Sequence, residues 1–310
     1  MLIYLSKITN PFCNIAMENY LFEHSKAKRI LYLYRNEPCV VIGRNQNPFV
    51  ECNLNYLIEH QIPLIRRYSG GGTVYHDLGN LNYSLMTPKA EFSRSKGVSF
   101  LKNALKTIAI DTHLTDRNDL VMHTKNGVKK ISGSAFKLAS QKCYHHGTLL
   151  CQSDLKSLKL GLKADDLQID SSAVTSVPMS VANINISVEN AIDCLINYCT
   201  STYSTGNCDL LQESDAVEQI ITLEQGDFLI PKLLEQIQLL KSFPWIYERT
   251  PKFKQVVEIN QQSRKIKVQY LQIIESEDPK LISRHYLELS SLNLTNSAQL
   301  NLVNTLNRVK

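Results

Sequence analysis

The sequence predicts an α+β fold, with a large domain over residues 1–248 and a small appended unit over residues 249–310. The first observation behind this prediction is that short apolar runs typical of strands are mixed with amphipathic stretches typical of helices. The second is that the strand pattern restarts after Thr250-Pro251. A chain of 310 residues is long enough for one large domain or for a large domain with a small one.

The predicted elements begin with a strand at residues 2–5. Asn10-Pro11 indicates the start of a helix, because proline is favoured at the first helical position. Apolar runs at residues 30–34 and 39–42 predict a pair of strands joined by a tight connection. A helix at residues 53–61 and a strand at residues 64–65 then lead to a run of glycines.

In the rest of the chain, Asn126-Gly127 is a strong hairpin signal. It predicts strands at residues 119–123 and 128–134. The remaining predictions are helices at residues 99–110, 189–201 and 228–241, strands at residues 144–150, 253–259 and 266–274, and two helical stretches up to the C-terminus.

The composition limits the class of protein. With 43% hydrophobic and 20% charged residues, the chain can bury a full core, and no apolar run approaches the roughly 20 residues that span a bilayer. The net charge of +5 comes from scattered basic residues, which permits an acidic partner but predicts neither nucleic-acid nor membrane binding. The eight cysteines form no C-x-x-C pair, so we expect free thiols. The N-terminus has no recognisable targeting segment.

The stretch RRYSGGGTVYHDLGNLNYS at residues 66–84 carries the first functional hypothesis. It fits neither a Walker loop, which needs a lysine after the glycines, nor a G-x-G-x-x-G fingerprint. A glycine turn can instead point its backbone N–H groups at an anion. Since Arg66 and Arg67 alternate faces of a strand, we expect only one of them to reach that anion. A purely structural turn is the alternative, and the polar face of Asn80, Asn82 and Ser84 favours a phosphate site.

A second cluster lies on the predicted hairpin. Lys130 and Ser132 share one face of a strand, where a lysine can stabilise an acyl-phosphate and the oxyanion that forms during attack on the acyl carbon. Two interpretations of Asn118-Asp119 are equally supported. The pair either contacts the amino group of a nucleotide base or a magnesium ion, or it caps a helix or strand. We reject a zinc site at His145-His146, because adjacent side chains on a strand point to opposite faces; one histidine is expected to face the ligand and the other the core.

Taken together, these motifs resemble the lipoate–protein ligase A and lipoyltransferase family. The resemblance covers nearly the whole chain, in order: CVVIGRNQNP at 39–48, RRYSGGGTVYHDLGNLN at 66–82, RNDLV at 117–121, KKISGSAFK at 129–137 and YHHGTLL at 144–150. It implies the biotin/lipoate-protein ligase-like α+β fold, with residues 1–248 as the catalytic domain. It also implies transfer of a lipoyl or octanoyl group, through an acyl-adenylate, to a lysine of a carrier domain.

The resemblance implies roles for individual residues. Lys130 falls on the family's catalytic lysine, Arg67 on its nucleotide-binding arginine, and Gly43, Arg44 and Gln46 on the border of its acyl site. The other binding residues implied by the motifs are Ser69, Gly70, Gly71, Gly72, Thr73, Val74, Tyr75, His76, Asn118, Asp119, Lys137 and His146. No metal ligand and no tightly bound cofactor is implied: lipoyl-AMP is a substrate, and ATP with magnesium is needed only by a ligase.

One departure bears on the reaction. Bacterial ligases carry an arginine within S-V-R-S, whereas this chain has Ser176-Val177-Pro178-Met179, which is more similar to the mitochondrial lipoyltransferase branch. The expected enzyme is therefore a lipoyltransferase using lipoyl-AMP or a lipoylated carrier protein. The alternatives are a complete ATP-dependent ligase, a cysteine-dependent octanoyltransferase and a non-catalytic nucleotide-binding subunit. The expected partners are lipoyl domains of 2-oxoacid dehydrogenase E2 subunits and the glycine cleavage H protein. We expect a mitochondrial monomer, with a cytoplasmic location as the alternative.

Overall fold

The structure is a computed structural model, and it describes residues 1–165, 167–205, 217–292, 294 and 297–309. The chain forms two compact units, each built from three separate segments. Unit 1 comprises Met1–Pro38, His76–Leu155 and Pro178–Ile237; unit 2 comprises Cys39–Tyr75, Lys156–Val177 and Gln238–Lys310. The domain boundary at residue 248 stays a prediction.

Unit 1 is built on a six-stranded mixed sheet with the order β10-β11-β6-β2-β1-β13. The strands are β1 (Leu2–Ser6), β2 (Ile30–Tyr34), β6 (Asn80–Pro88), β10 (Ser134–Leu138), β11 (Lys142–Leu150) and β13 (Gln219–Leu223). β1 runs parallel to β2 and β13, and the other pairs are antiparallel. The long strands β6 and β11 pair along their full length, from Asn80 opposite Leu150 to Pro88 opposite Lys142.

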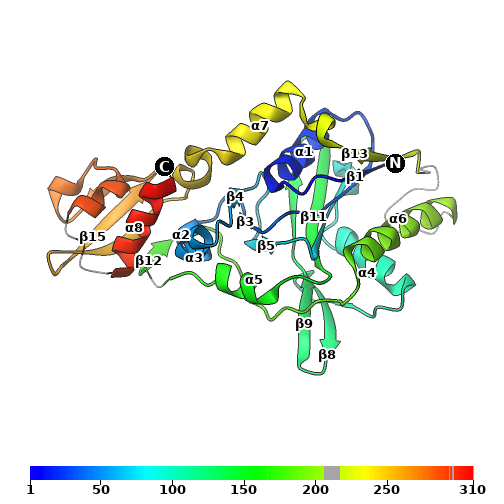
Figure 1. Cartoon of the computed structure of the whole chain (residues 1–310), viewed down its shortest axis with the longest axis horizontal. Coiled ribbons are helices and arrows are strands. Elements are labelled where there is room, and N and C mark those ends of the chain that lie inside the picture. The colour runs from blue at the N-terminus through cyan, green and yellow to red at the C-terminus, as the bar shows by residue number, and fades with distance from the viewer. Residues whose placement is uncertain (166, 206–216, 293, 295–296, 310) are drawn as a thin grey trace. The chain divides into compact units, whose positions relative to one another are not determined.

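Helices lie over both faces of this sheet. On one face, α4 (Lys96–Thr107) and α6 (Val188–Thr205) pack together against a core that includes Leu81, Tyr83 and Leu85 (Figure 1). On the other face lies α1 (Pro11–His24), whose Glu18 contacts His146 of β11. Asn10 caps α1 by accepting from the N–H groups of Phe12 and Cys13, as the Asn-Pro signal predicted. The sheet therefore has an apolar face and a polar face.

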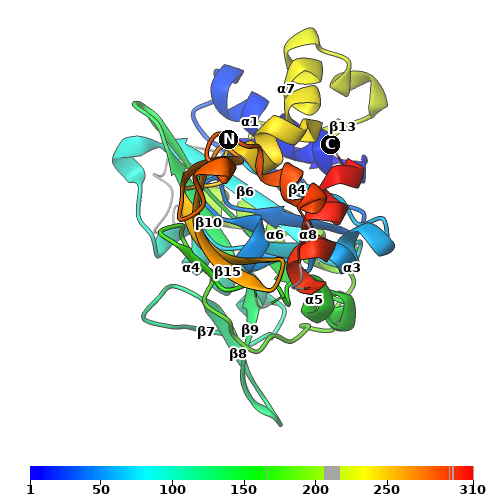
Figure 2. The same cartoon turned by 90° about the vertical axis from the view of Figure 1, so that its left-hand side faces the viewer.

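Unit 1 also contains a three-stranded sheet formed by β7 (His113–Leu114), β8 (Leu120–Thr124) and β9 (Gly127–Ser132). β8 and β9 form the predicted hairpin, whose tip extends away from the helices of unit 1 in both views (Figures 1 and 2). Gly127 has φ +90°, which explains the glycine after Asn126. A register shift between Leu120 and Val121 places Val121 opposite Lys130.

Unit 2 contains two sheets. The first has the order β4-β3-β5, with β3 (Cys39–Ile42), β4 (Leu64–Arg66) and β5 (Val74–His76), and is accompanied by α2 (Pro48–Glu51) and α3 (Leu54–Glu59). The second has the order β12-β14-β15-β16, with β12 (Ile169–Ser171), β14 (Phe253–Ile259), β15 (Gln262–Gln269) and β16 (Gln272–Ser276). Helix α8 (Ser297–Val309) packs against α3 and lies beside β15 (Figure 2).

Short helical segments complete the chain. They are η1 (Lys89–Glu91), α5 (Leu155–Gly161), η2 (Gln225–Phe228), α7 (Pro231–Lys241), η3 (Pro244–Glu248), η4 (Pro279–Leu281) and η5 (Tyr286–Ser291). The predicted helix at residues 99–110 starts three residues earlier, at Lys96. Among the described helices, none is long and apolar enough to cross a membrane.

Two predicted strand arrangements are wrong. Strands β2 and β3 do not pair with each other, because β2 joins β1 and β6 whereas β3 joins β4 and β5. Every residue of both strands is buried, so neither strand shows the alternation of apolar and polar residues that would help to predict its neighbouring strand. The predicted single strand at residues 266–274 is instead a hairpin: it contains the end of β15, a turn at Tyr270 and Leu271, which both have positive φ, and the start of β16. Such a turn is usually made by glycine, asparagine or aspartate, so these residues give no turn signal.

Candidate active site

Lys130 lies in the middle of β9 and forms an ion pair with Asp119. Its Nζ is 2.5 Å from Asp119 Oδ1, and the two side chains are 23% and 22% exposed. The backbone of Lys130 is held on both sides, by Val121 of β8 and by bonds to Ser180 and Ala182. The main chain of Lys130 is thus held in place, while its ammonium group pairs with Asp119 at a partly exposed position.

Asp119 follows a tight turn. Asn118 has φ +60° and donates its N–H to the carbonyl of Thr115, and the N–H of Asp119 donates to Thr115 Oγ1. These backbone contacts fit the cap interpretation of Asn118-Asp119. The carboxylate of Asp119 remains directed at Lys130 and so sets where that ammonium group lies.

Arg66 is a structural cation. It is fully buried, and its guanidinium donates to the carbonyl groups of Gln46 at 2.7 Å and Ile246 at 2.6 Å. Its further acceptors are the carbonyls of Gly43, Arg44 and Trp245 and Thr250 Oγ1. Burial lowers the pKa of Arg66 to about 10, and the group stays charged at neutral pH. Arg66 therefore joins residues 43–46 to the segment around Trp245 within unit 2.

Arg67, on the opposite face, organises the glycine loop. Its guanidinium donates to Ser69 Oγ at 2.9 Å and to the carbonyls of Val41, Gly70 and Gly72 at 3.1, 2.6 and 2.7 Å. The side chain is 5% exposed. Four of the five guanidinium N–H groups are thus directed at Ser69 and at backbone carbonyls.

Close packing requires glycine at position 43, and the backbone conformation favours glycine at position 71. A Cβ on Gly43 would lie 2.2 Å from the carbonyl oxygen of Gly71, and Gly71 itself has φ +86°. A Cβ on Gly72 would meet Ser176 Oγ at 3.0 Å. Gly70, by contrast, has nothing within 4 Å of such an atom.

A polar cluster that the sequence did not predict lies beside the loop in unit 2. Glu51, in α2, is only 6% exposed and accepts from the N–H of Ser176 at 3.0 Å and from the Ser176 hydroxyl. Thr73 donates its N–H to Ser176 Oγ at 2.8 Å, and its hydroxyl lies 2.8 Å from Gln46 Oε1 and 3.1 Å from Glu51 Oε2. Gln46 Nε2 also donates to Ser176 Oγ. Ser176 is thereby tied to Thr73 of the loop.

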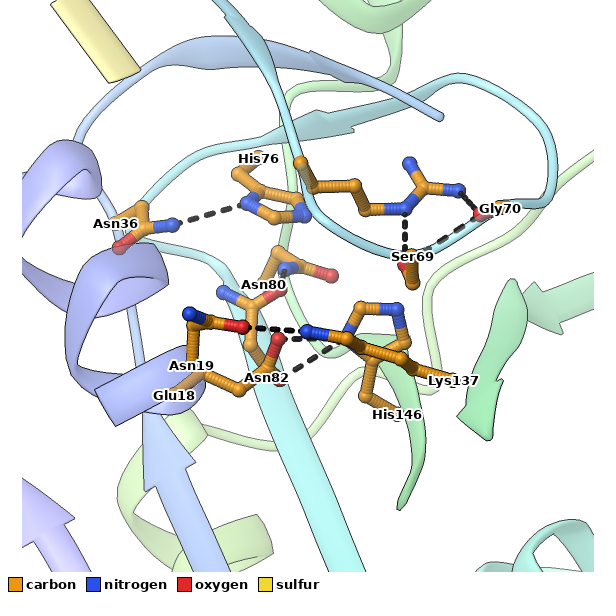
Figure 3. Close-up of polar contacts among 11 residues, drawn as sticks. Glu18, Asn19, Asn36, Ser69, Gly70, His76, Asn80, Asn82, Lys137 and His146 are labelled. Carbon is orange, nitrogen blue, oxygen red and sulfur yellow. Dashed lines mark hydrogen bonds and ion pairs between the residues drawn. The ribbon is translucent and has the colours of Figure 1, made fainter. Parts of the chain in front are cut away.

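Of the other predicted residues, Lys137 and His146 lie on strands of the unit 1 sheet, whereas Val74, Tyr75 and His76 form β5 of a three-stranded sheet. His146 Nδ1 lies 2.9 and 3.0 Å from the two carboxylate oxygens of Glu18, and Lys137 Nζ donates to Asn19 Oδ1 at 2.6 Å (Figure 3). His76 Nδ1 lies 3.0 Å from Asn36 Nδ2. Val74 and Tyr75, in β5, complete the predicted set, and Tyr75 is buried.

His145 differs from His146 as the strand alternation predicted. It is buried, neither ring nitrogen has a hydrogen-bond partner among the described residues, and its ring lies against Phe136 and Tyr83. Burial, together with the neighbouring His146, lowers the pKa of His145 to about 3, so its ring is uncharged at neutral pH. Within the described part of the chain, no three histidine, cysteine, aspartate or glutamate side chains gather as a metal site.

The cysteines give little support to thiol chemistry. Seven described cysteines are free, and Cys208 lies outside the described residues. Burial raises the pKa of the Cys151 thiol to about 12, and burial also raises the pKa of the Cys143 thiol. A thiol that holds its proton at neutral pH is a poor nucleophile.

Comparisons with known proteins agree with this architecture. Residues 10–199 match the family described as the lipoyl protein ligase A/B catalytic domain. The chain is 35% identical over 257 residues to lipoate-protein ligase A of Bdellovibrio bacteriovorus, covering 81% of this chain and 73% of that protein. It is 36% identical over 258 residues to the human mitochondrial lipoyl amidotransferase LIPT1, covering 81% and 66%. The crystal structure of P. falciparum LipL1 in complex with lipoate shares its fold, with a TM-score of 0.68, 25% identity and 98% of both chains covered.

These results define an enzyme of acyl transfer on the α+β fold of lipoate–protein ligases, which confirms the predicted fold class. The chain belongs to the lipoate–protein ligase and lipoyltransferase family.

Proposed function

We propose that the protein is a lipoyltransferase that moves a lipoyl or octanoyl group from a preformed donor, lipoyl-AMP or a lipoylated carrier protein, to a lysine ε-amine. The observation that carries this choice is Pro178, which stands where bacterial ligases have the arginine of S-V-R-S. Proline supplies neither charge nor a backbone N–H. Adenylation releases pyrophosphate, and without this arginine that leaving group would lack a stabilising cation. The transfer step releases no pyrophosphate and does not need this cation.

The transfer step needs a cation at the acyl group, and Lys130 is suited to it. Its backbone is fixed on both sides, while its ammonium group pairs with Asp119. A partly exposed ion pair is worth little, typically about 0.2–1 kcal/mol, so exchanging Asp119 for a substrate oxygen costs little. A fixed charge placed at the developing oxyanion lowers the barrier to attack.

For the nucleotide we propose Arg67 and the glycine loop. The loop contains three glycines and its carbonyls are gathered by Arg67, which leaves a main chain with few side chains to obstruct a ligand. The proposed binding residues are those implied by the family motifs, from Ser69 to His76 with Asn118, Asp119, Lys137 and His146. No resident cofactor or metal is part of the proposal.

The proposed acceptors are lipoyl domains of 2-oxoacid dehydrogenase E2 subunits and the glycine cleavage H protein. A structurally similar bipartite lipoate protein ligase from Thermoplasma acidophilum is described together with its E2 lipoyl domain. The mouse and human relatives are named as mitochondrial, which supports a mitochondrial location over a cytoplasmic one. We propose that the enzyme acts as a monomer.

The second candidate is a complete ATP-dependent ligase that uses magnesium. It is favoured by the relatives named lipoate-protein ligase A, which are 34–38% identical to this chain. Such an enzyme would activate lipoate itself and release pyrophosphate.

The deciding experiment gives the purified protein an unmodified lipoyl domain and one donor at a time: lipoate with MgATP, lipoyl-AMP, or a lipoylated carrier protein. We expect rapid lipoylation from lipoyl-AMP or the lipoylated carrier, and slow lipoylation from lipoate with MgATP. Mass spectrometry of the acceptor and a pyrophosphate assay give the readouts. Rapid lipoylation from lipoate and ATP, with stoichiometric pyrophosphate, would reject the transferase in favour of the ligase.

A further inference from the structure

Strand β9 has a free backbone edge next to Lys130. The N–H of Lys130 donates to the carbonyl of Ser180 at 2.9 Å, and its carbonyl accepts from the N–H of Ala182 at 3.0 Å, so both groups point away from β8. Alternate residues of an antiparallel strand direct their backbone groups to the same side, so Val128 also points its N–H and C=O outward. If the pairing continued toward the tip, the N–H of Ser180 would donate to the carbonyl of Val128. Among the described residues this bond is not made, and the edge is open at Val128.

The side chain at this edge is apolar and exposed. Val128 is 44% exposed and lies on the same face of β9 as Lys130, since side chains alternate along a strand. Proteins normally protect an open edge with charge, proline or a covering segment, because free backbone groups are a template for pairing with another strand. The tip of the hairpin extends away from the helices of unit 1 (Figures 1 and 2). The outer edge of β9 at Val128, which we call the β9 edge, therefore has the features of a strand-docking site.

The charge of the hairpin indicates the kind of partner. Residues 120–130, LVMHTKNGVKK, contain three lysines and no carboxylate. Lys130 pairs with Asp119, and the ammonium group of Lys129 donates to a neighbouring serine hydroxyl. Lys125, in the two-residue turn, is exposed and makes no ion pair with the described residues. An uncompensated cation at the tip favours a partner that carries carboxylates.

We propose that the acceptor protein docks on this hairpin by adding an extended, acidic segment to the β9 edge. The proposal rests on the proposed function, because it is the lysine of this acceptor that has to reach Lys130. The added segment accepts from the N–H of Val128 and donates to its carbonyl, and its carboxylates lie near Lys125. Backbone bonds of this kind supply affinity, and side-chain contacts supply selectivity. Since Lys130 is two residues farther along the same edge, about 7 Å away, docking there brings the acceptor close to it.

The other edge of the hairpin provides an internal control. His123 of β8 is directly opposite Val128, and its backbone groups point to the opposite side. β7 pairs only with Leu120 and Val121, so the edge of β8 at His123 is open as well. That edge continues into β7 and away from the β9 edge. A partner that uses the β9 edge therefore changes the environment of Val128 and leaves that of His123 unchanged.

The first experiment measures docking without catalysis. The full chain is titrated with an unmodified lipoyl domain of an E2 subunit, in the absence of any acyl donor, and backbone amide hydrogen exchange is followed by NMR. We expect the amide of Val128 to exchange more slowly in the complex, because the added segment bonds it. The amide of His123 should exchange at the same rate with and without the domain.

Proline substitutions test the same pair of positions in the transfer reaction. Proline is tolerated at a strand edge where the N–H faces solvent, so both Val128→Pro and His123→Pro should fold, as thermal unfolding checks. Val128→Pro removes the donor to the added segment and should lower kcat/KM for the lipoyl domain by about tenfold, with kcat unchanged. His123→Pro should leave both constants unchanged.

Side-chain variants keep the proposal testable if proline disturbs the hairpin. Val128→Glu places a carboxylate in the path of an acidic segment, and Ile220→Glu is its control on the edge strand β13, where Ile220 is 47% exposed. Lys125→Glu reverses the charge at the tip, with the exposed Lys26→Glu as control. We expect the two hairpin variants to lower kcat/KM about tenfold, because like charges across an interface disfavour association, and the controls to leave it unchanged.

Hydroxylamine separates docking from the donor site, because so small an acceptor needs no docking surface. All variants should convert lipoyl-AMP to lipoyl hydroxamate at the wild-type rate. A wild type that transfers from no donor overturns the proposed function and this inference with it. A wild type that lipoylates the domain overturns this inference alone if Val128→Pro and Val128→Glu match their controls, or if the Val128 amide stays unprotected. A dimer of the free protein that Val128→Glu dissociates in ultracentrifugation would assign the β9 edge to a second copy and also overturn it.

Discussion

The glycine loop and the lysine hairpin both contain the cations expected for an acyl-adenylate, but they hold them differently. In the loop, Arg66 and Arg67 are at most 5% exposed and donate mainly to backbone carbonyls. In the hairpin, Lys130 is about a quarter exposed and is held by the single carboxylate of Asp119. A saturated buried cation shapes the chain around it, whereas a cation with one exposed partner can exchange that partner for substrate.

The largest expected effect is on stability and concerns Arg66. Arg66→Met should lower the free energy of unfolding by at least about 3 kcal/mol, because each buried carbonyl left without a donor costs about 1–3 kcal/mol. Chemical denaturation monitored by the fluorescence of Trp245, the only tryptophan and a direct neighbour of Arg66, measures this loss. Arg264→Met is the control, because Arg264 is half-buried and its hydrogen bonds are exposed to solvent. A loss below about 1 kcal/mol would contradict the scaffold role of Arg66.

The next effect is on rate. Lys130→Ala should slow transfer from lipoyl-AMP by about 100-fold or more, the usual result of removing a group that stabilises developing charge. Its stability should change by no more than about 1 kcal/mol, since the ion pair with Asp119 is partly exposed. The neighbouring residue Lys129 donates its ammonium group to the exposed Ser180 hydroxyl. Lys129→Ala is therefore the matched control. Near-normal transfer by Lys130→Ala would remove it from the catalytic role.

The comparison also shows what the sequence could and could not predict. The hairpin was predictable because Asn-Gly is a local turn signal, and Lys130 followed from its place on that hairpin. The structural role of Arg66 was not, because its carbonyl acceptors around Ile246 are about 180 residues away in the chain. Glu51 was missed for the same reason: nothing near it in the sequence indicates its contact with Ser176. Contacts between distant segments depend on the fold, which local patterns do not encode.

Pairing errors have a related cause. The strands at Ile30–Tyr34 and Cys39–Ile42 were predicted at the correct residues. Because both strands are buried throughout, their sequences do not show that they belong to different sheets. The turn at Tyr270-Leu271 was missed because propensity there is overridden by the packing of Leu271, which is 1% exposed. Within the candidate site, the opposite faces of His145 and His146 were predictable from strand alternation alone.

The smallest expected effect tests how the loop itself is built. Gly71→Ala should lower the free energy of unfolding by about 1–2 kcal/mol, because a side chain is strained at φ +86°. Gly70→Ala should leave stability within about 0.5 kcal/mol, since nothing lies within 4 Å of the added carbon. Denaturant melts of the two variants give the difference, and titration with lipoyl-AMP shows whether the strained loop also loses the donor. Equal stability of the two would mean that the loop conformation is not fixed in the free protein. The contacts of Arg67 with the loop carbonyls would then be too weak to hold the loop, and the contrast with the hairpin would disappear.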